Sequence, residues 1–480
     1  MMRYLNYVLS LILVLIMLTG CKPAQKLASN STLHSDTDNI YAIRQVNVIP
    51  LIPGAEVITN ATVIISGDKI TSINGFIPPE AETIDGRGKW LIPGLIDMHV
   101  HVPTDIRFLP KAVTGSANVF FNTQDVMTPY IANGVTTILE LNSKAEHFAQ
   151  RNEIAKADVI GPRMALAALI NGGGGTGRVV NNAQDGRQAV RSAKAEGYEV
   201  IKVYSALNID TYHAIIDEAY KQGMKVIGHI PNAFKGKTEQ AFVPHFDMLA
   251  HAEELAKQSE DLTDADVNRF TQLIKQNGTW LSPTLTTMKW ILSQSKSLDE
   301  LRNSPALKYV HPLLQSKWLT ANNYNRGSNA DRVEYLTRVV DFNKRLVKAC
   351  YDAGVPIVLG TDTGASGLIA GFSVHDELEL LVAAGMQPKD ALISATRLSA
   401  EWLGIDNRVG TVQAGKLADL VLLDANPLDN IRNTRAIAGI FVNGRWLNLN
   451  TIESMLSDLS TRNNKAQSDF DWKTTVERSQ

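Results

Sequence analysis

The sequence predicts an α/β fold in which a (β/α)8 TIM barrel is combined with a small β-sandwich domain. From about residue 92 to residue 404, short apolar or β-branched runs alternate with longer stretches of helical periodicity, as they do in repeated βα units. The segments on both sides contain short strands separated by Gly, Pro and Asn instead. A chain of 480 residues is long enough for one large barrel with additions.

Eight strands are expected in the barrel, each followed by a helical stretch. The strands are expected at residues 94–101, 135–142, 163–170, 200–205, 225–230, 248–253, 279–285 and 356–361. The helices are expected at residues 116–133, 144–157, 184–196, 210–222, 236–243, 263–277, 331–353, 375–384 and 388–403. Several helices end at a glycine, the residue that most easily adopts the left-handed conformation found after a helix. These are Gly134, Gly197, Gly223, Gly278 and Gly354.

The strands that flank the barrel are expected to pair with one another although they are distant in sequence. Residues 41–90 and 410–450 share the same pattern of short strands, and together they predict one composite β-sandwich. The barrel then spans residues 91–409. The polar tail at residues 451–480 is expected to be a helix or a disordered end.

The connection after the seventh strand is too long for a simple loop. Residues 288–330 contain aromatic residues and a polar patch, and long βα connections often cover the active site of a barrel. We interpret this segment as a lid, and a helical insertion packed against the barrel rim is the alternative. Its aromatic residues are Trp290, Tyr309, Trp318 and Tyr324.

The amino terminus has the features of a secretory signal. Arg3 precedes a short apolar stretch, and residues 18–21 read Leu-Thr-Gly-Cys. This tetrapeptide resembles the lipobox of bacterial lipoproteins. The resemblance implies a lipoprotein signal peptide at residues 1–21, lipidation of Cys21 and a tether at residues 22–40. The protein would then be exported and anchored to a bacterial membrane, on the periplasmic side or at the outer membrane; a plain cleaved signal is the alternative.

Charge and cysteine content limit the classes of partner. The 47 basic and 49 acidic residues leave a formal charge of −2, which predicts no binding of nucleic acid and no membrane contact except through the lipid anchor. Cys350 is the other cysteine, so no disulfide forms within the chain once Cys21 is lipidated. The expected partner is a small-molecule substrate, and a homo-oligomer is left open.

Six polar residues stand at or near the ends of apolar runs. His99 and His101 are two residues apart at the end of LIPGLIDMHVH, so on a strand both imidazoles point to the same face. In a barrel, the carboxyl ends of the strands carry the active site, and imidazole and carboxylate are common metal ligands. We therefore predict a metal site. The other four residues are Lys202, His229, His251 and Asp362.

Each of these residues also has an ordinary structural alternative. Lys202 could be a solvated amine at the barrel rim, and His229 could be a hydrogen-bonded core histidine. His251 is followed by Glu253 and Glu254 and could pair with a carboxylate. Asp362 could cap the turn that follows it.

The sequence resembles the amidohydrolase superfamily over nearly the whole mature chain, and within it the branch of imidazolonepropionase-like and prolidase-like dipeptidases. The residues that carry the resemblance are LIPGLIDMHVH, the ordered Lys, His, His and Asp, and the closing stretch GTVQAGKLADLVLLDANPL. The resemblance implies two divalent metal ions, with Zn²⁺ expected. By position, one would be bound by His99, His101 and Asp362 and the other by His229 and His251. A CO₂-carboxylated Lys202 would bridge both ions.

The implied activity is hydrolysis of a non-cyclic C–N amide bond, in a dipeptide or an N-acyl amino acid. A hydroxide shared by the two metals would attack the carbonyl, with Asp362 as general base and then general acid. The alternatives are a cyclic-amide hydrolase, a deaminase with one metal, and a non-catalytic lipid-anchored binding protein. A deaminase is expected to have a glutamate three residues after the fifth-strand histidine, where this chain has Asn232.

Three further residues are candidates for substrate contacts. Arg178 ends the glycine-rich stretch 172–178 and could bind a carboxylate, although it could equally be a surface arginine. Tyr204 shares a strand face with Lys202 and could donate a hydrogen bond or pack in the barrel. His375 follows the eighth strand near the mouth of the barrel, where it could also simply begin a helix.

Overall fold

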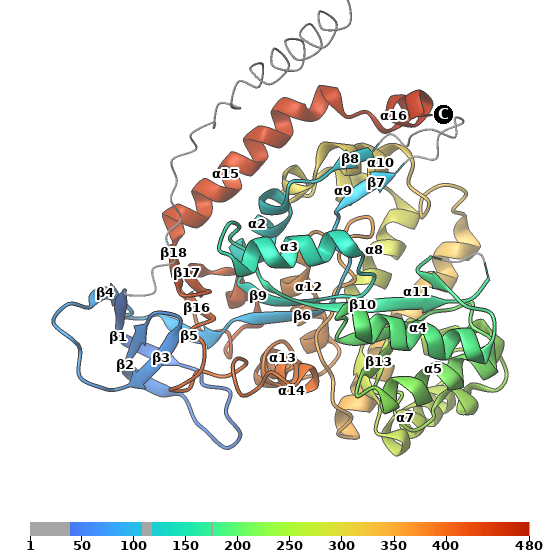
Figure 1. Ribbon diagram of the computed structural model, residues 1–480, viewed down its shortest axis with the longest axis horizontal. Coiled ribbons are helices and arrows are strands. Elements are labelled where there is room, and N and C mark those ends of the chain that lie inside the picture. The colour runs from blue at the N-terminus through green and yellow to red at the C-terminus, as the bar shows by residue number, and fades with distance from the viewer. Residues whose placement is uncertain (1–38, 108–117, 174–175, 480) are drawn as a thin grey trace, which may run out of the picture. The chain divides into compact units, whose positions relative to one another are not determined.

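The computed structural model describes residues 39–107, 118–173 and 176–479 (Figure 1). The predicted signal peptide, Cys21 and nearly all of the predicted tether lie outside these residues, so lipidation and export stay predictions. The first described strand, β1 (Ile40–Val48), begins at the last residue of the predicted tether. Among the helices of the described part, none is both long and apolar enough to cross a membrane.

Seven parallel strands form most of the barrel wall, and they follow one another around it in sequence order. They are β6 (Leu95–Val100), β9 (Val135–Glu140), β10 (Arg163–Asn171), β12 (Val200–Val203), β13 (Lys225–Gly228), β14 (Met248–Ala250) and β15 (Trp280–Ser282). Nearly all of their side chains are buried, because one face fills the barrel interior and the other lies under helices.

Residues 356–363 close the barrel at the eighth position. The amide of Val358 donates to the carbonyl of Leu281 in β15 at 3.0 Å, and the amide of Met98 in β6 donates to the carbonyl of Leu359 at 2.9 Å. Isolated bridges replace a regular strand here. The predicted barrel is therefore confirmed, and its eighth strand is a short bridging segment that we call the closing segment.

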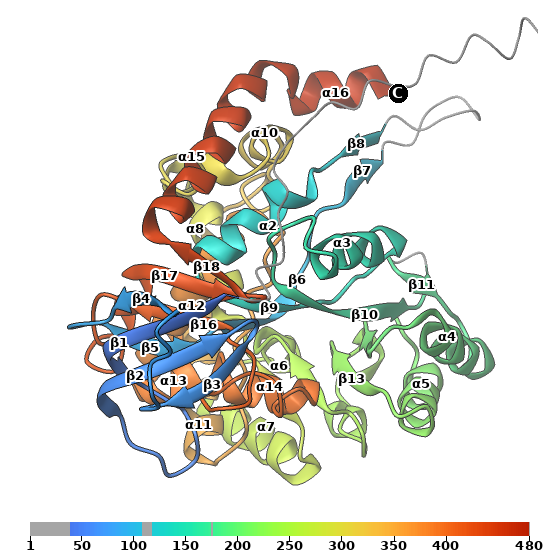
Figure 2. The same cartoon turned by 60° about the vertical axis from the view of Figure 1, so that its left-hand side comes forward.

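Helices surround the barrel strands (Figures 1 and 2). Those expected from the sequence are α2 (Thr123–Ala132), α3 (Ala145–Ala155), α4 (Ala183–Glu196), α5 (Ile209–Lys221), α7 (Asp264–Asn277), α11 (Ala330–Asp352), α12 (Phe372–Ala383), α13 (Pro388–Ser394) and α14 (Arg397–Leu403). All five glycines that were predicted to end helices have positive φ angles. This agrees with their predicted role as left-handed caps.

Three predicted helices differ from the structure. The helix expected at 116–133 begins only after Asn122, whose side chain accepts a hydrogen bond from the amide of Asp125 at 3.1 Å. The stretch at 236–243 contains only the short 3-10 turn η2 (Thr238–Ala241). The helix expected at 388–403 is divided at Thr396, whose φ of −140° and ψ of −90° are not helical.

Strands from both sides of the barrel form one mixed sheet. Its order is β18-β17-β16-β5-β1-β2-β3, with β4 paired to β1. The amino- and carboxyl-terminal parts meet where β5 pairs antiparallel with β16, with Leu91 opposite Leu422. The remaining strands are β2 (Ile58–Ser66), β3 (Lys69–Ile73), β4 (Glu82–Asp85), β5 (Trp90–Pro93), β16 (Leu420–Leu423), β17 (Ile437–Val442) and β18 (Arg445–Asn448). The predicted composite domain is thus one hydrogen-bonded sheet with its own apolar cluster.

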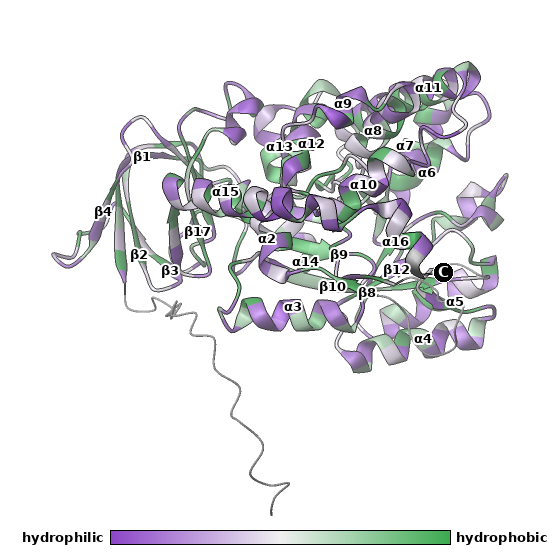
Figure 3. Ribbon diagram, turned by 90° about the horizontal axis from the view of Figure 1, so that it is seen from above, coloured by the Kyte–Doolittle hydropathy of each residue, from purple (hydrophilic) through white to green (hydrophobic). Residues whose placement is uncertain are grey.

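The predicted lid segment is helical. It contains most of α8 (Leu285–Lys296), α9 (Asp299–Arg302), the 3-10 turn η3 (Leu307–Tyr309) and α10 (Pro312–Thr320), which share an apolar cluster with the loop after the closing segment. Its motion as a lid stays a prediction. The carboxyl-terminal tail forms α15 (Leu449–Ala466) and α16 (Trp472–Ser479). Figure 3 shows hydrophilic and hydrophobic residues mixed along α15, and its buried residues include Leu459.

Candidate metal centre

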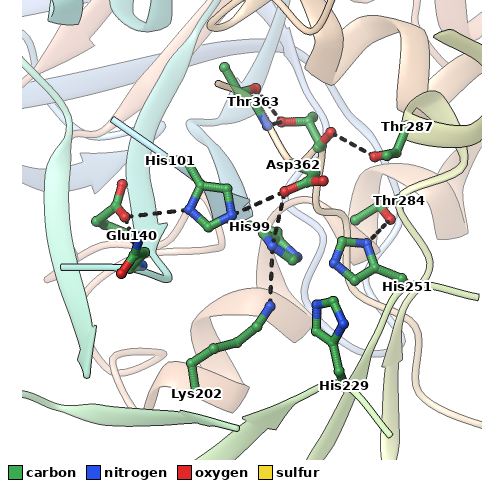
Figure 4. A network of polar contacts seen from close by, with 12 residues as sticks. His99, His101, Glu140, Lys202, His229, His251, Thr284, Thr287, Asp362 and Thr363 are labelled. Atoms are coloured by element: carbon green, nitrogen blue, oxygen red, sulfur yellow. Dashed lines mark hydrogen bonds and ion pairs between the residues drawn. The ribbon is translucent and has the colours of Figure 1, made fainter. Parts of the chain in front are cut away.

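The six predicted ligands lie together at the carboxyl ends of the barrel strands (Figure 4). His99 is in β6 and Lys202 is in β12, whereas His229 and His251 directly follow β13 and β14. Asp362 is in the closing segment. Parallel strands in a barrel end at the same rim, which is why residues far apart in sequence meet here.

Three of these residues form a group that could hold a metal ion: His99, His101 and Asp362, whose ligand atoms all lie within 4.8 Å of one another. Asp362 Oδ1 is 3.2 Å from His99 Nε2 and 3.1 Å from His101 Nε2. Around a tetrahedral Zn²⁺ with bonds of about 2.0–2.1 Å, neighbouring ligand atoms are about 3.3 Å apart. The spacing and the chemistry of this donor set therefore fit a divalent cation.

Glu140 orients His101 from the neighbouring strand β9. Its Oε1 lies 3.7 Å from His101 Nδ1 and accepts a hydrogen bond from the amide of Asn142 at 2.8 Å. The other oxygen accepts from the amide of Val102. A carboxylate on the far nitrogen fixes a histidine ring and makes it a better metal ligand. Glu140 was not among the residues predicted from the sequence, although it stands at the end of a buried strand.

His229 and His251 each have one ring nitrogen occupied by a fixed partner. His229 Nδ1 lies 3.0 Å from Glu254 Oε1 and 3.1 Å from Ser205 Oγ. His251 Nδ1 lies 2.7 Å from Thr284 Oγ1. Each ring therefore keeps Nε2 for another ligand.

The two rings also lie close together, with centroids 4.8 Å apart. Glu254, one of the two carboxylates that could have paired with His251, instead pairs with His229. These two histidines thus share one side of the site. The groups that contact their Nδ1 atoms do not belong to the six predicted residues.

Lys202 lies between the two histidine groups and is completely buried. Its Nζ is 3.3 Å from His99 Nε2. Among the described residues, no carboxylate oxygen lies within 4.0 Å of this amine. Burial lowers the pKa of Lys202 to about 8, although the charge of Asp362 opposes the shift. The structure therefore places the amine away from solvent, in contrast to the alternative of a solvated lysine at the rim.

Burial makes three of the four imidazoles neutral. It lowers the pKa of His99 to about 3, with a further contribution from Lys202, and it lowers the pKa of His229 and of His251 as well. A neutral imidazole is the form that binds a metal. Burial also lowers the pKa of His101, but the neighbouring carboxylates of Asp362 and Glu140 outweigh it and raise that pKa to about 9.

The backbone is strained at the residues that form the site. His251, Thr284 and Asp362 have φ angles of 70°, 46° and 58°, in the left-handed region that non-glycine residues rarely adopt. Gly364 has a φ of 114°, and a Cβ there would collide with the carbonyl oxygen of His101. Strained residues of this kind are typical of functional sites.

Asp97 connects β6 to the closing segment beneath the ligands. Its Oδ1 accepts hydrogen bonds from the amides of Thr361 at 3.0 Å and His99 at 3.2 Å, and its Oδ2 accepts from Thr361 Oγ1 at 2.6 Å. Burial raises the pKa of Asp97 to about 7. This aspartate holds together the two segments that supply His99 and Asp362.

The three candidate substrate residues lie in different places. The ring of Tyr204 is beside His229, with centroids 4.1 Å apart, so Tyr204 adjoins the site. Arg178 pairs with Glu196, to whose Oε1 it donates at 2.9 Å. His375 is buried in α12, with Nδ1 2.9 Å from Thr434 Oγ1. Among the contacts of the described residues, none links Arg178 or His375 to the six predicted ligands.

A family model decides the relationship: the amidohydrolase family matches residues 90–447. The chain belongs to this family. The imidazolonepropionase of Thermoplasma volcanium is 20% identical over 397 residues, which cover 78% of this chain and 86% of that protein.

Two solved structures share the fold. One is a Xaa-Pro dipeptidase with bound methionine in the active site; it has a TM-score of 0.64 and 21% identity and covers 85% of this chain and 100% of its own. The other is the bottromycin amidohydrolase, with a TM-score of 0.69 and 19% identity, covering 89% of this chain and 92% of its own.

Proposed function

We propose that this amidohydrolase is a metal-dependent hydrolase that cleaves a non-cyclic amide bond in a dipeptide or an N-acyl amino acid. The observation that carries the proposal is the meeting of four histidines, one aspartate and one buried lysine at the mouth of the barrel. The resemblance to a Xaa-Pro dipeptidase structure supports the choice of a peptide-like substrate.

The proposal includes two divalent cations, with Zn²⁺ as the expected metal. His99, His101 and Asp362 would hold one cation, and His229 and His251 would hold the other through their remaining ring nitrogens. Lys202, carboxylated by CO₂, would span both, because a carbamate is an anionic two-oxygen ligand whereas an ammonium group binds no metal. When bound, such cations activate water near neutral pH and polarise the substrate carbonyl.

Asp362 is the group that would move the proton. The pKa of Asp362 is held well below its ordinary value, because the neighbouring His99 and hydrogen bonds from His101 and His99 outweigh the effect of burial. The side chain is 16% exposed, so water and substrate can reach it. As water adds to the carbonyl carbon, Asp362 accepts its proton and then gives it to the nitrogen as the C–N bond breaks. The products are a carboxylic acid and an amine.

A cyclic-amide hydrolase is the second candidate, because the same groups can open a ring. A deaminase with one metal is less well supported. The residue three positions after His229 is Asn232, and asparagine is not the acid that such a reaction requires. Its backbone amide donates to the backbone carbonyl of Ser205 at 2.9 Å. A non-catalytic binding protein has no need for six groups arranged as metal ligands.

The test is a screen of dipeptides, N-acyl amino acids and cyclic amides against the metal-loaded protein, together with a count of metal per chain. We expect two metals and hydrolysis of acyclic amides. Lys202→Ala should lose bound metal and at least about 100-fold in kcat/KM, because even the loss of a residue that only orients a metal ligand costs up to about 100-fold. The matched control, Lys221→Ala on the exposed end of α5, should change neither. Full metal content and activity in Lys202→Ala would contradict the bridging role.

A further inference from the structure

A narrow cavity with a volume of about 70 Å³ adjoins the metal centre. Its lining includes His101 and Thr363, the residue that follows Asp362. The side chain of His101 is 35% exposed. Its imidazole therefore both contacts Asp362 and forms part of the cavity wall. A substrate bound over Asp362 therefore has the cavity beside it.

Apolar side chains from four parts of the chain line the cavity. Phe121 comes from the segment before α2, and Leu314 and Trp318 come from α10. Ile369 belongs to the loop after the closing segment, and Leu459 is in α15. Apart from Leu314, which is half-buried, these side chains are buried. The cavity is too small to hold an aromatic ring without steric overlap, but it can hold a short aliphatic group.

The wall supplied by α15 is fixed by hydrogen bonds to the predicted lid segment. Asn463 Nδ2 donates to the carbonyls of Lys308 at 3.0 Å and Val310 at 3.1 Å. Farther along the tail, the amide of Trp472 donates to Ser316 Oγ at 2.9 Å. The family match ends at residue 447, before α15 begins, so this wall is an addition to the matched fold.

The cavity carries no unpaired charge among its described lining residues. Asp125 forms an ion pair with Arg462 of α15 at 2.5 Å. Burial lowers the pKa of His311 to about 4, so its imidazole is neutral at neutral pH, and its ring packs against Phe121 with centroids 4.7 Å apart. An ionised group entering the cavity would lose its hydration without gaining an unpaired opposite charge among the described lining residues.

We propose that this cavity binds a short branched aliphatic side chain of the substrate, such as that of valine or leucine, and so determines which amides the hydrolase prefers. The inference rests on the proposed function. Each additional methylene that an apolar pocket accepts raises kcat/KM by roughly 10- to 200-fold. A group that fills the cavity should therefore be favoured over alanine, and glutamate should be rejected.

The experiment uses the full, metal-loaded chain and two series of dipeptides, X-Gly and Gly-X, in which X is Ala, Val, Leu, Phe or Glu. In one of the two series we expect kcat/KM for Val or Leu to exceed that for Ala by at least about tenfold. Leu314→Phe fills the cavity and should remove this preference. Leu319→Phe is the matched control, because Leu319 lies on the same helix but does not line the cavity.

A binding measurement separates the cavity from the reaction. Calorimetric titration should show that free leucine binds the protein at least about tenfold more tightly than free glutamate, and that Leu314→Phe but not Leu319→Phe removes the difference. In the opposite direction, Leu459→Ala enlarges the cavity and should improve the Phe substrate relative to the Val substrate. Circular dichroism checks that each variant folds.

The outcomes distinguish the two proposals. Hydrolysis of the dipeptides without any side-chain preference, or with equal preference in wild type and Leu314→Phe, would overturn the cavity inference and leave the hydrolase function in place. Selective leucine binding without hydrolysis of any amide would support the cavity and contradict the hydrolase function. Equal binding of leucine and glutamate would overturn the cavity inference even for an inactive protein.

Discussion

At the scale of single residues, the site depends on hydrogen bonds that set the second ring nitrogen of His229 and of His251. His251 illustrates this, because its Nδ1 has the hydroxyl of Thr284 as its partner at 2.7 Å. Thr284 itself has a φ of 46°, so the surrounding fold holds it in a strained conformation to present that hydroxyl. Partners of this kind orient a metal ligand and raise its affinity.

We predict that Thr284→Val lowers metal affinity by about 10- to 100-fold, the usual effect of losing such a partner. Valine keeps the shape of threonine but has no hydroxyl, so His251 loses the group that fixes its ring. The measurement is a competition between the protein and a chelator for the metal. Thr284→Ser keeps the hydroxyl and should bind metal like the wild type. Equal affinity of both variants would show that the hydroxyl does not position His251.

The candidate ligands could be predicted because each is visible within its own segment. His99, Lys202 and Asp362 stand at the ends of apolar runs, and a parallel barrel brings such ends together. Their partners could not be found in this way. Thr284 lies 33 residues from His251 in sequence, and its role depends on a strained turn that no local pattern indicates.

At the scale of elements, α12 holds the start of α8 in place. Glu377 of α12 is fully buried and accepts hydrogen bonds from the amides of Leu285 at 2.8 Å and Thr286 at 2.7 Å. It also accepts from Thr286 Oγ1 at 2.9 Å. The first amides of a helix have no partner within the helix, so a carboxylate there satisfies them. The turn that carries Thr284 directly precedes these two residues.

Glu377 gives a pH-dependent contribution to stability. Burial raises its pKa from 4.5 to about 7, although the hydrogen bonds from α8 oppose the shift. An acid whose pKa is raised by folding binds its proton more tightly in the folded protein. Its stabilising contribution is therefore complete below about pH 4.5 and is lost as the pH rises to about 7.

We predict that the free energy of unfolding of the wild type, minus that of Glu377→Gln, falls by up to about 3 kcal/mol between pH 4.5 and pH 7 and stays constant above pH 7. This follows because one pKa unit corresponds to about 1.4 kcal/mol. Glutamine has nearly the same shape and does not titrate. Chemical denaturation of both proteins from pH 5 to pH 8 measures the difference. Parallel stability curves would contradict the role of Glu377. Glu334→Gln at an exposed position of α11 is the control.

The elements themselves were predictable to different degrees. Barrel strands and helices such as α4 and α7 follow from hydrophobic periodicity and glycine caps, which are local signals. The division of residues 388–403 at Thr396 was not predictable, because a continuous apolar pattern runs through the break. For residues 288–330 the sequence left a lid and a packed helical insertion as alternatives without placing the helices α8 to α10. Their apolar residues pack against the loop after the closing segment, which only the fold brings near.

At the scale of the whole molecule, the barrel is least regular where the chain closes it. The closing segment at residues 356–363 is joined to its neighbours by isolated bridges. Backbone hydrogen bonds also join this segment to β6, including one from the amide of Asp362 to the carbonyl of His99 at 2.8 Å. Side chains add further connections, through Asp97 with Thr361 and through Asp362 with His99 and His101. A metal held by β6 and the closing segment together would therefore connect the first and last parts of the barrel.

Metal removal should accordingly destabilise the molecule, and most strongly at this closure. A ligand that binds only the folded state adds about 2.7 kcal/mol at a hundredfold excess over its Kd. We expect chelation to lower the denaturation temperature and to increase amide hydrogen exchange in the closing segment and β6 more than in β9 and β10. Added Zn²⁺ should reverse both effects in the wild type but not in His99→Ala. A uniform increase in exchange over all barrel strands would contradict this, because it would mean that the cation stabilises the fold without joining its two ends.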